Sequence, residues 1–87
     1  MPRLLGRLGA PPIEVLEIVF TRWDEVVSGD LGAHLRPLRV DRSALVVAAD
    51  HPAWATRARL EAADILACIH ALGESPIQRL EVVIERP

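Results

Sequence analysis

The chain has 87 residues, of which 51% are hydrophobic and 25% charged, and its formal net charge is -2. This length is typical of one domain, and the single cysteine excludes an internal disulfide and is typical of a protein kept in a reducing cytosol. No apolar run approaches the roughly 20 residues of a membrane span and no signal peptide is recognisable, so we expect a cytoplasmic protein without a membrane partner.

The first third of the chain predicts an arm and a helix. Residues 1–10 show little periodicity, so we expect a loose N-terminal arm followed by one domain over residues 11–87. Pro11-Pro12 suits the first turn of a helix that runs to about Val27, because the apolar residues of this segment recur at helical spacing. One further helical turn is expected between residues 30 and 35.

Alternating apolar and polar residues predict three strands in the rest of the chain. The first covers residues 38–41 and the second residues 45–49, and the turn material between them is Asp41-Arg42-Ser43. This spacing predicts a hairpin. The last strand covers residues 79–85.

A long helix is predicted between the hairpin and the last strand, over residues 52–72. Pro52 suits its first turn, Asp50 is the expected N-cap and Gly73 the expected stop. The apolar residues that share one face at helical spacing are Trp54, Ala58, Ala62, Ile65, Ile69 and Leu72.

Together these elements predict an α+β fold with the order α-β-β-α-β. We expect a three-stranded sheet with two helices on one face and a more polar, solvent-exposed opposite face. The order of the strands within the sheet is left open by the sequence.

Several short groups of residues follow one another in an order that resembles the DciA family. They are Trp23-x-x-Val26-Val27-x-Gly29-x-Leu31, His34-x-x-Pro37, Leu45-x-Val47 and His51-Pro52-Ala53-Trp54-Ala55, followed by an arginine-bearing helix. The resemblance covers about residues 15–84. DciA proteins are bacterial proteins that associate with the replicative helicase and assist its loading on DNA. The resemblance implies a similar partner here, and a domain similar in shape to a type II KH domain without its phosphate-clamping loop.

The chain departs from the family pattern in three places. The hairpin turn, often Asp-Gly in the family, is Asp41-Arg42-Ser43 here, which predicts a longer or more strained turn. The Gln-Leu often found after the second tryptophan is Arg57-Ala58 here. The long extension of the family is absent from this sequence.

Four arginines are the candidate nucleic-acid contacts. Residues 34–59 hold five Arg against two Asp, a net charge of +3. Arg57 and Arg59 lie in the first two turns of the long helix, where free N–H groups favour an anion, and Arg36 and Arg39 begin the hairpin. We predict that the four arginines form one phosphate-contacting patch for single- or double-stranded DNA, with weak, sequence-independent contacts to the backbone and with a plain solvated surface as the alternative.

Two other features have a functional and a structural interpretation. A ridge on the long helix, Leu60, Ala63, Ala67 and Ala71, is a candidate seat for a partner helix or for a second copy in a homodimer, although the alanines also simply favour a helix. Trp23 and Trp54 are expected in the core, where each indole N–H needs an acceptor.

The remaining motifs indicate no phosphate clamp, metal site or catalytic site. Gly6-Arg7-Leu8-Gly9 and Gly29-Asp30-Leu31-Gly32 match the letters of the KH clamp, but neither lies between the two helices that such a clamp needs. The three histidines and Cys68 do not converge at metal-ligand spacing, and no nucleophile motif is present, so we expect no enzyme, metal or cofactor. The open alternatives are a KH-like module that binds DNA or RNA without a helicase, and a dimerisation domain.

Overall fold

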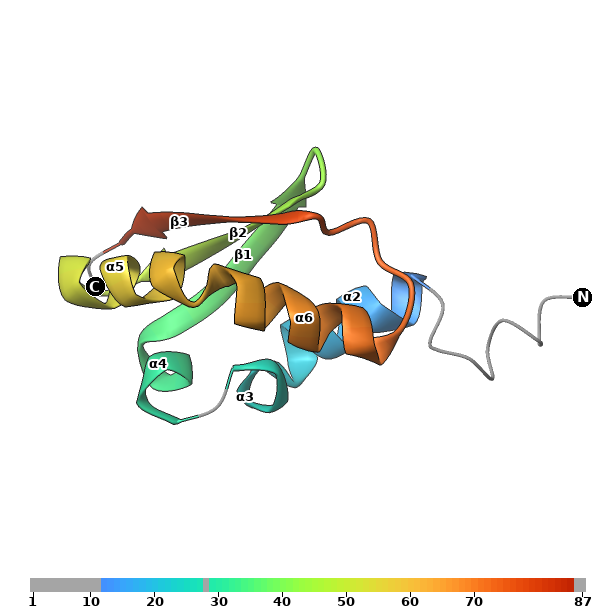
Figure 1. Cartoon of the computed structure of the whole chain (residues 1–87), viewed down its shortest axis with the longest axis horizontal. Coiled ribbons are helices and arrows are strands. Elements are labelled where there is room, and N and C mark those ends of the chain that lie inside the picture. Colours follow the sequence, from blue (N-terminus) through green and yellow to red (C-terminus); the bar gives the residue numbers. More distant parts are fainter. Residues whose placement is uncertain (1–11, 28, 86–87) are drawn as a thin grey trace, which may run out of the picture.

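The computed structural model describes residues 12–27 and 29–85, and the expected arm at residues 1–10 lies outside the described residues. Five helices and three strands follow one another along the described chain (Figure 1). They are α2 (Pro12–Thr21), α3 (Trp23–Val26), α4 (Gly29–His34), β1 (Leu35–Asp41), β2 (Ala44–Ala49), α5 (Pro52–Leu60), α6 (Ala62–Leu72) and β3 (Arg79–Ile84). The α+β class is confirmed, as is the extra helical turn, which is α4.

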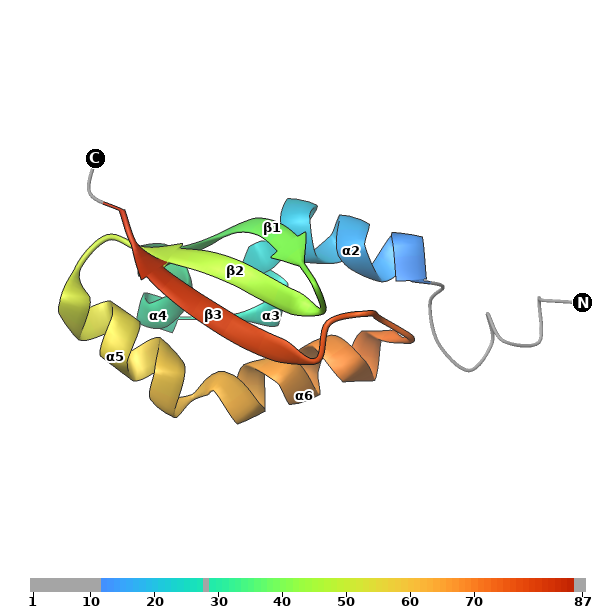
Figure 2. The ribbon, with the colours of Figure 1, turned by 90° about the horizontal axis from the view of Figure 1, so that it is seen from above.

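The strands form one sheet in the order β1-β2-β3, with β1 antiparallel and β3 parallel to β2. All the described helices lie on one face of this sheet (Figures 1 and 2), as the sequence predicts. None of these helices could span a bilayer, since the longest of them, α6, has 11 residues and a span needs about 20.

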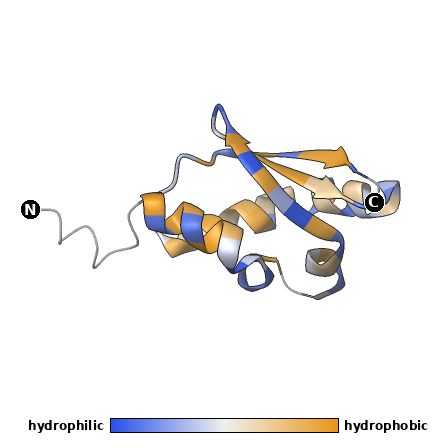
Figure 3. Cartoon of the chain, turned by 180° about the vertical axis from the view of Figure 1, so that it is seen from behind, coloured by the Kyte–Doolittle hydropathy of each residue, from blue (hydrophilic) through white to orange (hydrophobic). Residues whose placement is uncertain are grey.

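The central strand shows which face holds the core. Leu45, Val47 and Ala49 of β2 join the core cluster, whereas the alternate residues of this strand turn to the other face. Alternating polar and apolar bands are visible along β1 in Figure 3. We call the helix-free side of the sheet the open face, defined by Arg36, Arg39 and Asp41 of β1, Ala44, Val46 and Ala48 of β2, and Arg79, Glu81 and Val83 of β3.

The predicted helix over residues 11–27 is wrong as one element, because the chain leaves the helical region at Arg22 (φ -129°, ψ 48°). Thr21 donates its hydroxyl to the Glu17 carbonyl at 2.6 Å, a bond that competes with the helix and bends it. Arg22 then pairs with Glu25 across the first turn of α3, with Nη2 2.8 Å from Oε1. No proline or glycine marks this break.

The predicted helix over residues 52–72 is also two elements. Glu61 (φ -100°, ψ 10°) separates α5 from α6, and the two helices form a bent line beside β3 (Figure 2). The Glu61 N–H still donates to the Arg57 carbonyl at 3.0 Å, so the bend leaves that backbone donor satisfied. The expected apolar face is nevertheless the one that packs: Ala58, Ile65 and Ile69 are buried, and Trp54, Ala62 and Leu72 are half-buried.

The hairpin turn is strained rather than long. Asp41 pairs with Ala44, so only Arg42 and Ser43 form the loop, and both have positive φ values of 51° and 72°. Positive φ at both central residues is the signature of a type I′ turn, which Asn and Gly fill at least cost. A side chain at such a position costs about 1 kcal/mol relative to glycine.

We therefore expect Ser43→Gly to raise the free energy of unfolding by up to about 1 kcal/mol. The loop keeps its contacts in this variant, because Ser43 accepts from the Gln78 and Arg79 N–H groups through its backbone carbonyl. Urea denaturation measures the change. Ala71→Gly, at an exposed helical position, is the control and should lose about 1 kcal/mol. A lower free energy of unfolding in Ser43→Gly would show that the positive φ value of Ser43 does not strain the turn.

Candidate functional site

Arg36 and Arg39 lie on β1 and face the helix-free side of the sheet. Arg36 is cross-strand from Ala48 and Arg39 from Val46. Arg36 forms an ion pair with Glu85, just beyond the end of β3, so its side chain reaches across the central strand. Arg39 is exposed and forms no ion pair with any residue in the described ranges. It is the more available of the two for an outside partner.

Arg57 and Arg59 lie on α5, in the layer of helices. Arg57 pairs with Glu61, with Nε 2.9 Å from Oε2, and this hydrogen bond raises the pKa of the guanidinium above its usual value. The Arg57 guanidinium also lies 5.9 Å from the ring centroid of Trp54. Arg59 donates from Nη2 to the Val82 carbonyl of β3 at 3.2 Å. The four arginines are thus divided between the open face and the helix layer, and they do not lie together on one face as the predicted single patch requires.

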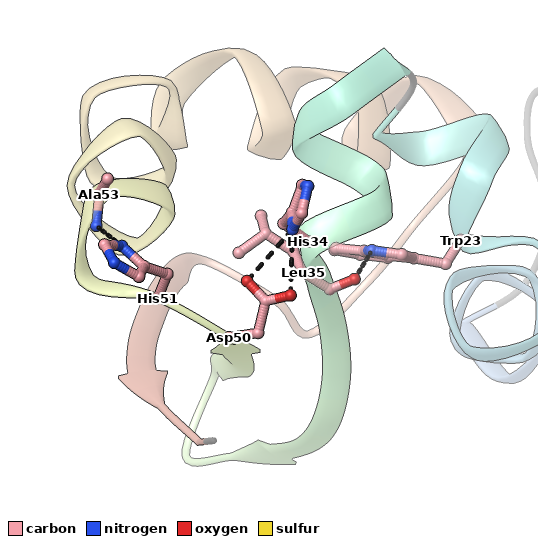
Figure 4. A network of polar contacts seen from close by, with 6 residues as sticks. All are labelled: Trp23, His34, Leu35, Asp50, His51 and Ala53. Atoms are coloured by element: carbon pink, nitrogen blue, oxygen red, sulfur yellow. Dashed lines mark hydrogen bonds and ion pairs between the residues drawn. The ribbon is translucent and has the colours of Figure 1, made fainter. Parts of the chain in front are cut away.

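The start of α5 is held by a network of histidines and a carboxylate (Figure 4). His51, and not the predicted Asp50, is the N-cap: its Nδ1 accepts from the Ala53 N–H at 3.1 Å, so its ring proton is on Nε2. Asp50 instead accepts from His34 Nδ1, 3.0 Å from Oδ2. A histidine in the helix before β1 draws the carboxylate away from the cap, and that contact spans sixteen residues of sequence.

Both tryptophans are half-buried against the core. The Trp23 indole N–H donates to the Leu35 carbonyl at 3.0 Å (Figure 4), which fixes α3 to the start of β1 and confirms the predicted acceptor for this residue. Trp54 stacks on His34 with ring centroids 4.3 Å apart and planes 7° apart. His34 covers one surface of the Trp54 ring, so the pair joins α4 to α5.

The ridge residues lie on the solvent side of α5 and α6. Leu60 is 81% exposed, the largest exposed fraction among the exposed large hydrophobic residues of the described chain. Ala63, Ala67 and Ala71 are exposed as well. The break at Glu61 falls between Leu60 and the alanines, so the ridge bends where the helix bends.

The structure places one of the two glycine pairs, and that pair does not form a clamp. Gly6 to Gly9 lies outside the described residues, and Gly29 to Gly32 is inside α4. Gly29 has φ +74°, and a Cβ on Gly32 would lie 1.9 Å from the Val27 carbonyl oxygen. Both positions therefore need glycine for a structural reason. Gly29 adopts a positive φ value, and Gly32 allows a close approach to the Val27 backbone.

A cavity of about 310 Å³ lies where β2 and β3 end, and its lining includes His34, Arg36, Asp50 and Glu85. Each of its two carboxylates is already bonded, Asp50 to His34 and Glu85 to Arg36. No group of three or more His, Cys, Asp or Glu that could hold a metal is found in the part of the chain that the structure describes. Sequence reasoning missed this cluster, because its pairs are 16 and 49 residues apart and leave no local pattern.

Comparison with known proteins gives one family. The family model described as "Dna[CI] antecedent, DciA" matches residues 2–82. A UPF0232 protein of Rhodococcus jostii (strain RHA1) is 37% identical over 65 residues, which are 74% of this chain and 35% of that protein. A UPF0232 protein of Streptomyces avermitilis is 35% identical over 83 residues, 92% of this chain and 46% of that protein. The chain spans less than half the length of these curated relatives, and no solved structure matches it.

Proposed function

Because this chain belongs to the DciA family, we propose that it acts in bacterial DNA replication by associating with the replicative helicase. The observation that carries the proposal is the family match over residues 2–82, nearly the whole chain. The family is related to helicase loading, which supports an accessory role in replication. The proposal includes a non-enzymatic role in the cytoplasm, where the bacterial helicase works on the chromosome.

We place the helicase contact on the ridge formed by Leu60, Ala63, Ala67 and Ala71. An exposed leucine beside small exposed side chains allows a partner helix to approach closely and to bury the leucine. Burying such a side chain contributes about 1.5–3 kcal/mol. A charge at Leu60 would remain buried in that contact and would prevent it.

We expect Leu60→Glu to weaken capture of the helicase by tenfold or more, because about 1.4 kcal/mol of lost contact is a factor of ten. The fold should survive, since Leu60 is exposed. Titration of the purified helicase in a pull-down measures the effect, with circular dichroism as the check on folding. The control is Ile13→Glu, an equally drastic change at a 74% exposed position on α2. Unchanged capture by Leu60→Glu would reject the ridge as the contact.

We also propose that Arg36, Arg39, Arg57 and Arg59 contact the DNA backbone weakly. Because these residues lie in two layers, we expect two separate pairs of phosphate contacts and not the single patch predicted from the sequence. Contacts of this kind make affinity tolerant of sequence and steeply dependent on salt. A KH-like module without a helicase would show this binding and no capture of the helicase.

Replacing Arg57 and Arg59 with alanine should lower affinity for a labelled single-stranded oligonucleotide at low salt. If two phosphate contacts are lost, the slope of log affinity against log salt should flatten by about 1.4. Fluorescence anisotropy at several salt concentrations measures both quantities. Arg22→Ala, which removes an exposed arginine from the junction between α2 and α3, is the control. Identical slopes in the double variant and the native chain would end the DNA proposal for α5.

A further inference from the structure

The open face carries a charge pattern that runs across the sheet. The strand register places residues of the three strands side by side, and cross-strand neighbours point to the same side. In the middle of the sheet this gives an arginine on β1 and a carboxylate on β3, and one step toward the hairpin turn the two signs are exchanged. Read from β1 to β3, the first row is Arg39, Val46 and Glu81. The second row, nearer the hairpin turn, is Asp41, Ala44 and Arg79.

The charged side chains stand above an apolar floor. Ala44, Val46 and Ala48 are at most 2% exposed, although no described helix covers this side of the sheet. The long side chains of the two outer strands therefore cover the floor with their stems and carry their charges outward. Val83 is the large hydrophobic residue exposed on this face, at 37%. An approaching surface thus meets charges first.

This pattern is complementary to itself under a two-fold rotation that overlaps the whole open face. When the rotation axis is parallel to β2, β1 of one copy lies over β3 of the other and the positions along the strands are kept. Arg39 then meets the partner's Glu81, and Asp41 meets the partner's Arg79. Within one copy Arg79 and Glu81 also form an exposed ion pair with each other, with Nη2 3.3 Å from Oε2, so each contact between copies joins a charge to an existing pair. By symmetry every such contact occurs twice.

The other in-plane axis, perpendicular to the strands, keeps β1 over β1 and β3 over β3. When it passes through the Arg39 row, Arg39 meets the partner's Arg39 and Glu81 meets the partner's Glu81, which is repulsive. When it passes midway between the two rows, Arg39 meets the partner's Asp41 and Glu81 meets the partner's Arg79, but the two sheets then overlap only at their hairpin ends. The axis parallel to β2 is therefore the arrangement that combines opposite charges with overlap of the whole open face, with the strands nearly aligned. We propose that the open face is the interface of a homodimer built in this way.

The size of the face sets the strength of the dimer. Three strands about 4.8 Å apart, paired over six positions, cover about 14 by 20 Å, which is well below the roughly 800 Å² per partner of a stable interface. The dimer is accordingly weak and forms at high protein concentration. Because its contacts are between charges, it dissociates as salt rises. It also covers Arg39, so DNA and a second copy compete for this face.

The test uses two charge reversals of the full chain, Arg39→Glu and Glu81→Arg. Each variant alone brings like charges together twice in the dimer, so self-association measured by sedimentation equilibrium at low salt should weaken about tenfold or more. An equimolar mixture of the two variants is complementary at all four positions. The mixture should associate at least as well as the native chain, which also shows that both variants are folded. Glu74→Arg, an exposed charge reversal outside the face, is the control and should associate normally.

The proposal is overturned if the native chain stays monomeric at millimolar concentration and low salt. It is equally overturned if the two single variants self-associate as the native chain does, or if both fail and their mixture fails too. A dimer that is lost in Leu60→Glu and kept in Arg39→Glu would place the interface on the helices instead.

Discussion

Replacing Gly32 with alanine is expected to remove at least about 3 kcal/mol of the free energy of unfolding. A Cβ at this position would lie 1.9 Å from the carbonyl oxygen of Val27 and 3.0 Å from its carbonyl carbon. Those atoms belong to the backbone, so no side chain can rotate to make room. A chain of this length has a total stability of roughly 4–13 kcal/mol, so the variant loses a large part of it.

The neighbouring glycine supplies the control for this prediction. A Cβ on Gly29 would meet nothing within 4 Å, and its only requirement is a φ of +74°. Gly29→Ala should therefore cost about 1–2 kcal/mol, the usual penalty for a side chain in the left-handed region. Chemical denaturation gives the free energy of unfolding of both variants, and it distinguishes the steric clash at Gly32 from the backbone strain at Gly29. Equal losses in the two variants would show that the contact with Val27 is not the reason for Gly32.

The same two glycines show how a motif can mislead. Gly29 and Gly32 have the spacing of a phosphate clamp, but the structure uses them to start α4 and to bring it against Val27. The spacing alone cannot separate these roles, because both depend on the absence of a side chain. The surrounding element decides between them, and here that element is a short helix with an aspartate inside it.

The main features of the fold follow from hydrophobic periodicity. The strands around Val40, Val47 and Val82 are where alternation predicts them, and the helices pack through the apolar positions that share a face. The breaks at Arg22 and Glu61 could not be found in this way. They are produced by backbone torsions at residues without turn chemistry, where tertiary packing overrides the local preference for a straight helix.

The candidate sites were less predictable than the fold, for a related reason. Asp50 has the side chain of a good cap, yet it bonds to His34 and leaves the cap to His51. The sequence could not reveal this competition, because it depends on α4 and the end of β2 meeting in space. Arg36 meets Glu85 in the same way, across the sheet. The charge pattern of the open face likewise depends on the order of the strands in the sheet, and hydrophobic periodicity does not determine that order.

Ile77→Ala is expected to remove about 2–5 kcal/mol of stability, although the residue lies in the connection between α6 and β3. The sequence there suggests an ordinary loop, but Ile77 is 0% exposed and belongs to the core cluster. Its backbone is held from both sides: the N–H donates to the Ser75 hydroxyl at 3.0 Å, and the carbonyl accepts from His70 Nε2 at 2.9 Å. The side chain is thus fixed in place, and its removal leaves a cavity that the loop cannot close.

The comparison that tests this argument is Ile84→Ala, the same truncation at a residue that is 42% exposed at the end of β3. This variant should lose clearly less than Ile77→Ala, at most about 2 kcal/mol, since the Ile84 side chain is already in contact with water over 42% of its surface. Denaturation with urea, with equal slopes for both variants, gives the two free energies directly. If Ile77→Ala were no worse than Ile84→Ala, the connection would be a surface loop after all.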